Sequence, residues 1–168
     1  MYASSQTEAR VNYTVGAACC CAATDASVEI TGGCLCGSVR FRISAAPITT
    51  RVCWCRLCQY LGAGSGTVNV CFPSAAVTIT GATANHTSIA GSGNTMHRRF
   101  CPACGTPLFS AAEARPHLLF VRAGCLDDPE VARPVMTIWT AAAPTWACFD
   151  GRLPQESGQP PPAAPAPS

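Results

Sequence analysis

The spacing of the cysteines constrains this chain more than any other feature of its sequence. Of the 13 cysteines among 168 residues, seven fall into three clusters, C-x-C at 34–36, C-x-C-x-x-C at 53–58 and C-x-x-C at 101–104. A disulfide within a C-x-C pair would close a strained ring, whereas thiolates this close together can converge on one tetrahedral ion with bonds of ~2.3 Å. The odd total also leaves at least one thiol unpaired. We therefore interpret the clusters as metal ligands rather than as a disulfide framework.

The other six cysteines lack this spacing. Cys19, Cys20 and Cys21 are consecutive, and we assign them no role. Cys71, Cys125 and Cys148 are isolated in apolar surroundings, where a lone cysteine is usually a small core residue. Cys71 is the exception that matters, because it can in principle supply a further ligand to the middle cluster.

Composition narrows the class of protein. Hydrophobic residues make up 48% and charged residues 12%, which favours a folded chain over a disordered one. The net charge of +2 gives no indication of nucleic-acid binding, and the absence of lysine excludes a lysine Schiff base. No apolar run is long enough to span a membrane, and segment 13–26 lacks the pattern of a signal peptide. We expect a cytoplasmic protein.

The sequence predicts one domain with two extensions. Residues 1–27 show no clear periodicity and are expected to be poorly ordered. Residues 155–168 read QESGQPPPAAPAPS, a Pro/Ala-rich composition typical of a disordered, solvated tail. The folded domain is therefore expected over residues 28–154.

Short β-type runs separated by turn residues recur through this domain. Val39, Phe41 and Ile43 alternate with polar residues, as in a half-buried strand, and a similar alternation places Cys71 opposite an apolar row. No helical period of ten or more residues is convincing. The pattern predicts an all-β sandwich or barrel. The expected strands are 28–31, 38–43, 67–72, 77–80, 95–100, 118–123 and 136–140.

The positions of the clusters suggest two kinds of site. The outer pairs flank expected strands beside Gly37 and Gly105, which suit tight turns. Together they offer four sulfurs, enough for a closed structural zinc site that joins two hairpins. The middle cluster offers three, which leaves a coordination position free for water or substrate, as in a catalytic zinc site. Spacing alone leaves open whether Cys71 or a histidine closes this second site.

Several longer motifs support a family resemblance. In order along the chain they are GGCLCGSVRF at 32–41, CWCRLCQ at 53–59, RFCPACGTPLF at 99–109, AGCLDDP at 123–129, IWT at 138–140 and PTWACFDGRLP at 144–154. Together they resemble the glutathione-dependent formaldehyde-activating enzyme family, which also contains centromere protein V. The resemblance covers residues 28–154, the whole expected domain.

This resemblance implies a fold, two zinc ions and an activity. The implied fold is a twisted β-sandwich of short antiparallel strands braced by zinc–cysteine sites. The implied activity is that of a carbon–sulfur lyase, the reversible addition of glutathione to formaldehyde, with a small-molecule thiol and an aldehyde as partners. The implied structural zinc is held by Cys34, Cys36, Cys101 and Cys104, and the implied catalytic zinc by Cys53, Cys55 and Cys58.

Two positions depart from the common family pattern. Trp54 stands where relatives commonly carry histidine, which we expect to make the site more apolar. Ala141, Ala142 and Ala143 occupy a segment that often carries a basic residue in relatives. Both changes bear on whether glutathione itself is the thiol.

We hypothesise that a thiol bound at the open zinc loses its proton and attacks an aldehyde carbon. Guanidinium groups suit the carboxylates of a peptide-like thiol and equally the neutralisation of anionic zinc–thiolate centres. The three histidines are expected to be structural or surface residues, and Asp127–Asp128 to form a turn. The candidate guanidiniums lie next to the clusters: Arg51, Arg56, Arg98 and Arg99.

Two rival interpretations share the cysteine pattern. One is a non-catalytic zinc module that binds a protein or chromatin; the near-neutral charge and the missing lysine count against chromatin. The other is methionine sulfoxide reductase B, which needs a reactive cysteine in an R-x-C-x-N-like segment. Here Ala103 stands where asparagine is required, and Cys101 is already assigned to zinc.

Overall fold

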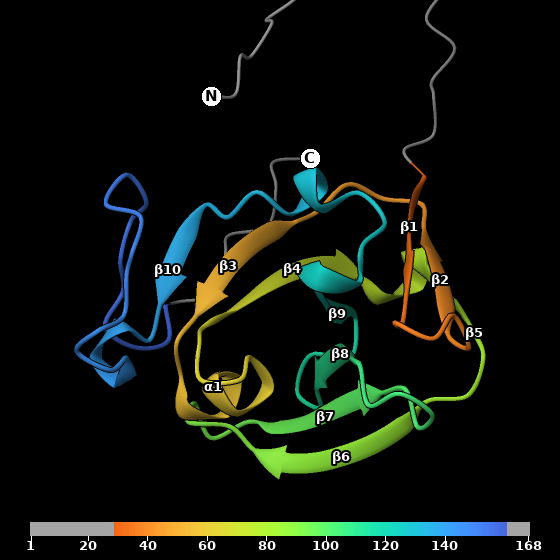
Figure 1. Ribbon diagram of the computed structural model, residues 1–168, viewed down its shortest axis with the longest axis horizontal. Helices are drawn as coiled ribbons and strands as arrows, with labels where there is room; N and C mark the ends of the chain where they lie inside the picture. Colours follow the sequence, from red (N-terminus) through yellow and green to blue (C-terminus); the bar gives the residue numbers. More distant parts are fainter. Residues whose placement is uncertain (1–28, 161–168) are drawn as a thin grey trace, which may run out of the picture.

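The computed structural model describes residues 29–160, so the predicted extension at 1–27, with Cys19, Cys20 and Cys21, lies outside the described residues. The described part contains ten strands, which form two sheets, and one short α-helix (Figure 1). One sheet has three strands in the order β1-β2-β5, and the other has seven in the order β10-β3-β4-β9-β8-β7-β6. The protein is an all-β sandwich, as the sequence predicted.

The bounds of the elements are as follows. The small sheet contains β1 (Ile30–Gly33), β2 (Arg40–Ile43) and β5 (Val77–Thr80). The large sheet contains β10 (Met136–Ile138), β3 (Thr49–Cys53), β4 (Thr67–Pro73), β9 (Leu118–Arg122), β8 (Pro107–Ala112), β7 (Thr95–Phe100) and β6 (Ala84–Ile89). The helices are α1 (Arg56–Leu61), η1 (Ser74–Ala76), η2 (Ala123–Cys125), η3 (Pro129–Ala132) and η4 (Thr140–Ala142).

All seven expected strands overlap observed ones, whereas β3, β6 and β8 were not predicted. β6 is polar and lies at the edge of the sheet, so it lacks the apolar alternation that identifies a strand. The pairings are antiparallel except for one: β10 runs parallel to β3, which departs from the expected antiparallel pattern. This parallel pairing follows the long excursion of the chain from β3 to β10.

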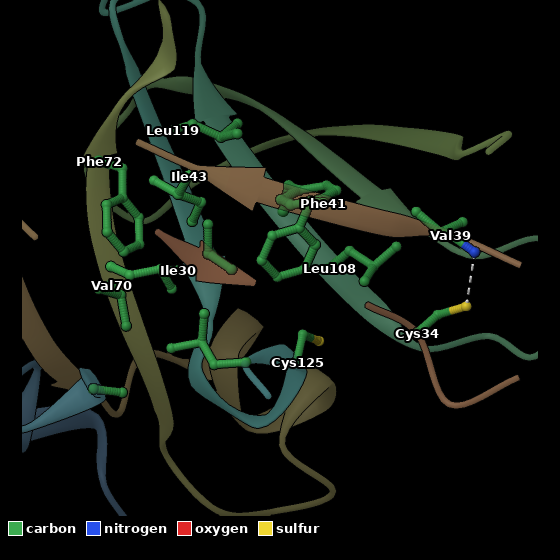
Figure 2. Close-up of a cluster of buried hydrophobic side chains, with 14 of the residues drawn as sticks. Ile30, Cys34, Val39, Phe41, Ile43, Val70, Phe72, Leu108, Leu119 and Cys125 are labelled. Carbon is green, nitrogen blue, oxygen red and sulfur yellow. Dashed lines mark hydrogen bonds between the residues drawn. The ribbon is translucent and has the colours of Figure 1, made fainter. Parts of the chain in front are cut away.

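The core lies between the two sheets (Figure 2). Phe41 and Ile43 of β2 face Val70 and Phe72 of β4, and all four are almost completely buried. The Phe41 ring meets Phe109 of β8 edge-on, with ring centroids 5.2 Å apart. The alternation in β2 and β4 therefore directs apolar side chains into the sandwich and leaves the opposite face of the large sheet for other residues.

The large sheet curls, so that β6 and β7 lie opposite β3 and β4 (Figure 1). Its inner face carries the side chains that alternate with the core residues. On β3 these are Thr49, Arg51 and Cys53, because Thr50 and Val52 alternate with them. Since cross-strand neighbours share a face, the curl gathers residues from six strands around one space.

Residues 155–159 continue along the edge of the large sheet. The Glu156 amide donates to the Thr137 carbonyl at 2.9 Å, and the Thr140 amide donates to the Glu156 carbonyl at 3.1 Å. The sequence predicted a solvated tail from Gln155, but the edge strand β10 offers unpaired backbone groups that this segment satisfies. The exact domain limits stay a prediction.

The α-helix α1 has six residues, far fewer than the roughly 20 that a membrane-spanning helix needs. Within residues 29–160, no helix is long and apolar enough to cross a membrane.

Candidate functional site

The outer cysteine pairs form one four-sulfur cluster, as expected from their spacing. Cys34 and Cys36 lie in the turn between β1 and β2, and Cys101 and Cys104 in the turn between β7 and β8. All four sulfurs lie within 4.8 Å of one another; Cys34–Cys36 and Cys36–Cys101 are 3.5 and 3.8 Å apart. A tetrahedral ion with bonds of ~2.3 Å requires sulfur separations of about 3.8 Å. The cluster therefore fits one metal ion that would tie the small sheet to the large one.

The turns around this cluster are shaped for it. Gly37 and Gly105 adopt φ of 77° and 73°, a region that favours glycine. The Val39 amide donates to Cys34 Sγ at 3.2 Å. The Thr106 hydroxyl contacts Cys104 Sγ at 3.1 Å and, as the largest cause, lowers the pKa of Cys104 to about 5. Such hydrogen bonds favour the thiolate form that ligates metals.

The middle cluster forms a separate three-sulfur group. Cys53 ends β3, Cys55 lies in the following loop, and Cys58 is on α1; their sulfurs also lie within 4.8 Å of one another. The buried Gln59 fixes this loop, because its Nε2 donates to the Trp54 carbonyl at 2.6 Å and to the Ala142 carbonyl at 2.9 Å. The loop geometry thus depends on a contact with residues more than 80 positions away.

Of the three cysteines in this group, Cys58 is the one whose pKa is lowered. Hydrogen bonds with Cys53 and Cys55 lower the pKa of Cys58 to about 2, with further help from Thr67 and the charge of Arg122. Hydrogen bonds with Cys55 and then Cys58, together with burial, raise the pKa of Cys53. Three thiols with one shared proton network are typical of a site whose ligands deprotonate together when a cation binds.

No fourth protein ligand closes the three-sulfur group among the residues that the structure describes. Cys71 is buried on β4, opposite Thr49, whereas Cys53 is opposite Thr67. The four-residue offset corresponds to about 13 Å along the strand, so Cys71 is too far away. The histidines also stay outside both sulfur groups; His97, for example, contacts the Thr87 hydroxyl at 3.1 Å.

The open side of the three-sulfur group faces a pocket on the inner face of the curled sheet. Its volume is about 130 Å³, close to the ~150 Å³ of a cavity that binds benzene. Met96, Ile138 and Trp139 supply apolar wall, and Gln159 also lines the pocket. Four arginines line it and no acidic residue of the described chain does. These arginines are Arg51, Arg98, Arg115 and Arg122.

The sequence identified two of these four arginines. Arg51 and Arg98 line the pocket, but Arg56 lies over the Tyr60 ring, 4.9 Å from its centroid. Arg99 donates to the Thr83 hydroxyl at 3.0 Å, outside the pocket. Neither Arg56 nor Arg99 lines the pocket, because adjacent residues on a strand or helix face different ways. Arg122 was missed although it alternates with Leu119 and Val121, while Arg115 lies in a turn with no periodic signal.

Trp54 does not face the three-sulfur group, which corrects the expectation that it makes the site more apolar. Its buried ring packs edge-on against Trp146 and Phe149, with centroids 6.4 and 5.7 Å away. A second surface hollow, beside Ser65 and Gly66, lies on that side of the sheet. Trp54 alternates with Cys53 and Cys55 and therefore points to the opposite side.

Comparison with known proteins identifies the family. Residues 29–142 match the family model described as "Glutathione-dependent formaldehyde-activating enzyme". The chain belongs to this family. The matched residues include all seven cysteines of the two sulfur groups and every strand of the two sheets.

Individual relatives of this glutathione-dependent formaldehyde-activating enzyme family are distant in sequence. A protein of Halomonas elongata, named "Putative glutathione-dependent formaldehyde-activating enzyme", is 30% identical over 112 residues, which cover 62% of this chain and 69% of the relative. A crystal structure of a Rhodobacter sphaeroides protein aligns with a TM-score of 0.46 and 20% identity over 58% of this chain and 87% of that one.

The remaining polar residues that the sequence singled out are structural in this family member. Asp127 accepts hydrogen bonds from Arg40 and from the Thr31 hydroxyl, and so links β1 and β2 to the loop after η2. Asp128 accepts from the Glu130 amide at 3.0 Å and caps η3. The two carboxylates diverge, as expected for a turn.

Proposed function

We propose that this protein is a zinc-dependent carbon–sulfur lyase that adds a thiol, glutathione or a similar one, reversibly to an aldehyde such as formaldehyde. Its membership of the glutathione-dependent formaldehyde-activating enzyme family supports the reaction class. The observation that carries the proposal is the difference between the two sulfur groups: the three-sulfur group lines a pocket, and the four-sulfur group does not line that pocket.

In this proposal each chain holds two zinc ions with different roles. The four sulfurs of Cys34, Cys36, Cys101 and Cys104 hold a structural ion, since they complete a tetrahedron. Cys53, Cys55 and Cys58 hold a catalytic ion. When bound by three thiolates, zinc supplies a free coordination position at which the pKa of a substrate thiol falls.

The chain's own residues prepare the pocket for a negatively charged sulfur. Arg122 lies within electrostatic reach of Cys58, and Arg98 within reach of all three cysteines. The Arg122 side chain is fixed by hydrogen bonds to Asn69 Oδ1 and the Thr67 hydroxyl, and Arg98 by one to the Ser88 hydroxyl. Met96, Ile138 and Trp139 exclude part of the surrounding water. Fixed guanidiniums in such a site stabilise the thiolate more than they would in water.

The bond changes are those of an addition without oxidation or reduction. The substrate sulfur forms a bond to the aldehyde carbon, the carbonyl π bond breaks, and its electron pair moves to oxygen. That oxygen takes up the proton that the thiol released. The product is an S-hydroxyalkyl thiol, and the reverse reaction regenerates both partners.

The alternative is a non-catalytic zinc module that binds a protein or chromatin. Such a module needs an exposed binding face, whereas the three-sulfur group opens into a pocket of about 130 Å³. We therefore favour small-molecule partners, expect neither a nucleic acid nor a membrane as partner, and keep the cytoplasm as the predicted location.

Nuclear magnetic resonance exchange spectroscopy tests the proposal. The zinc-loaded protein, added to a mixture of glutathione and formaldehyde, is expected to raise the exchange rate between free and adduct glutathione above the spontaneous value. Cys55→Ser is expected to abolish the increase. Cys148→Ser, at an exposed cysteine outside both groups, is the matched control and keeps it. An exchange rate that stays spontaneous with glutathione and with other small thiols rejects the proposed lyase.

A further inference from the structure

The charge of the pocket is unusually one-sided. Residues 29–160 include seven acidic residues, and none lines the pocket, whereas four arginines do. Sheet register explains how they meet. Arg51 and Arg122 are both paired with Asn69, one strand on either side of it, which places their Cα atoms about 10 Å apart on one face. The adjacent set of cross-strand partners begins at Thr49 of β3, passes through β4, β9 and β8, and ends at Arg98 of β7.

Two of these arginines interact electrostatically with the three-sulfur group. Arg122 is about nine-tenths buried and lies within electrostatic reach of Cys58. Arg98 lies near both Arg122 and the three cysteines; burial, and then the charge of Arg122, lower the pKa of Arg98. An ion on three thiolates has a net charge of −1, and a substrate thiolate adds another. Arg98 and Arg122 are sufficient to balance these two charges.

The other two arginines, Arg51 and Arg115, are not among the charges that act most strongly on the three cysteines. None of the four pocket arginines takes part in the four ion pairs of the described chain, and the Nε atoms of Arg51 and Arg122 are both buried without an acceptor. Arg98 and Arg122, however, donate to Ser88, Thr67 and Asn69. Arg51 is two residues before Cys53, about 7 Å along β3. Arg115 lies farther away, in the turn that joins β8 to β9. Cys71 is paired with Thr49 and Phe120, which line the pocket, and both arginines lie within electrostatic reach of Cys71. Arg51 and Arg115 therefore share the end of the pocket that Thr49 and Phe120 form.

We propose that Arg51 and Arg115 bind the acidic groups of the substrate, and that this substrate is a dicarboxylic thiol without an ammonium group. This inference rests on the proposed function and narrows its substrate class. Guanidinium–carboxylate pairs are charge-assisted and directional, so two unpaired guanidiniums at one end of a pocket select two carboxylates. An ammonium group finds four positive charges and no carboxylate to receive it. Glutathione carries such a group, and is therefore a poorer substrate than an acidic thiol that lacks it.

The binding of dicarboxylic acids that lack a thiol tests this selectivity without the addition reaction. Succinate and aspartate differ by one ammonium group, and calorimetry on the zinc-loaded protein compares them. Succinate is expected to bind one per chain and about tenfold more tightly than aspartate. Arg115→Gln is expected to weaken succinate about tenfold, whereas Arg133→Gln, at an exposed arginine paired with Glu130, leaves it unchanged. Equal binding of the two acids, no succinate binding, or an unaffected Arg115→Gln variant overturns the inference.

Kinetics with three small thiols separates this inference from the proposed function. With formaldehyde, mercaptosuccinate is expected to have a KM about tenfold below those of 2-mercaptoethanol and cysteamine. Arg115→Gln is expected to raise only the KM for mercaptosuccinate. Equal KM values for all three thiols overturn the substrate class and leave the lyase intact. Succinate binding without acceleration of any thiol overturns the lyase and leaves the acid-binding site intact.

Discussion

At the scale of single residues, the same side chain takes three roles in this protein. Cys104 is held by a threonine hydroxyl that lowers its pKa, Cys58 by two neighbouring thiols, and Cys71 is a buried neutral thiol whose pKa is raised by burial. Cysteine spacing predicted which seven would gather, because ligands one or two residues apart are placed by local turns. It did not reveal that Cys71 stays apart, because that depends on strand register.

The first prediction contrasts the two sulfur groups. Cys55→Ser is expected to lower the zinc content from two ions per chain to one, abolish thiol addition and change thermal stability little, since Cys55 lies in a loop at the pocket. Cys104→Ser is expected to destabilise the fold by several kcal/mol, because a structural metal contributes directly to folding free energy. Metal analysis and thermal unfolding measure both. Equal destabilisation by the two substitutions contradicts the division of roles.

The second prediction concerns Trp54. Trp54→His introduces the residue common in the family but removes ring packing against Trp146 and Phe149. We expect a loss of roughly 2–3 kcal/mol of unfolding free energy, with unchanged zinc content and unchanged kcat/KM at a temperature where the variant is folded. Urea unfolding and the exchange assay measure these. A changed kcat/KM would show that the side chain reaches the pocket after all.

At the scale of elements, the turns were more predictable than the strands that they join. Gly37 and Gly105 mark tight turns from sequence alone, and both take positive φ. β3 was missed, because its inner face carries Thr49 and Arg51 instead of apolar residues. The residues that break the apolar alternation of β3 are the ones that line the pocket. The site residues therefore weakened the sequence pattern that would have predicted the strand on which they lie.

The third prediction concerns the link between the small sheet and the loop after η2. Arg40, through its hydrogen bond, and then Thr31 lower the pKa of Asp127 below its usual 3.8. A carboxyl group whose pKa is lower in the folded state than in the unfolded state stabilises the fold at pH values above its unfolded-state pKa. This contribution is lost as the pH falls below about 3.8. Both partners are about half exposed, so Asp127→Asn is expected to cost at most about 1 kcal/mol at pH 7 and less at pH 3.

Urea unfolding at the two pH values tests this prediction. Glu130→Gln provides the comparison, because its ion pair with Arg133 is local and far more exposed. A difference between wild type and Asp127→Asn that persists undiminished at pH 3 would contradict the assigned cause.

At the scale of the whole molecule, two sheets of unequal size give the protein two separate interiors. One is the apolar core around Phe41 and Phe72, which strand alternation predicted. The other is the arginine-lined pocket inside the curled sheet. The pocket could not be predicted, because it depends on how β6 and β7 fold back toward β3 and β4. Arg115 illustrates this: it lies in the turn between β8 and β9, without a periodic signal, and yet lines the pocket.

The central claim is that seven sulfurs divide into a complete set of four and an open set of three. Zinc K-edge X-ray absorption combined with metal counting tests it most directly. We predict two zinc ions per chain with an average of between three and four sulfurs each. A competing chelator should remove one ion first, and the remaining ion should then show four sulfurs. A single ion per chain, or four sulfurs around every ion before chelation, would contradict the account.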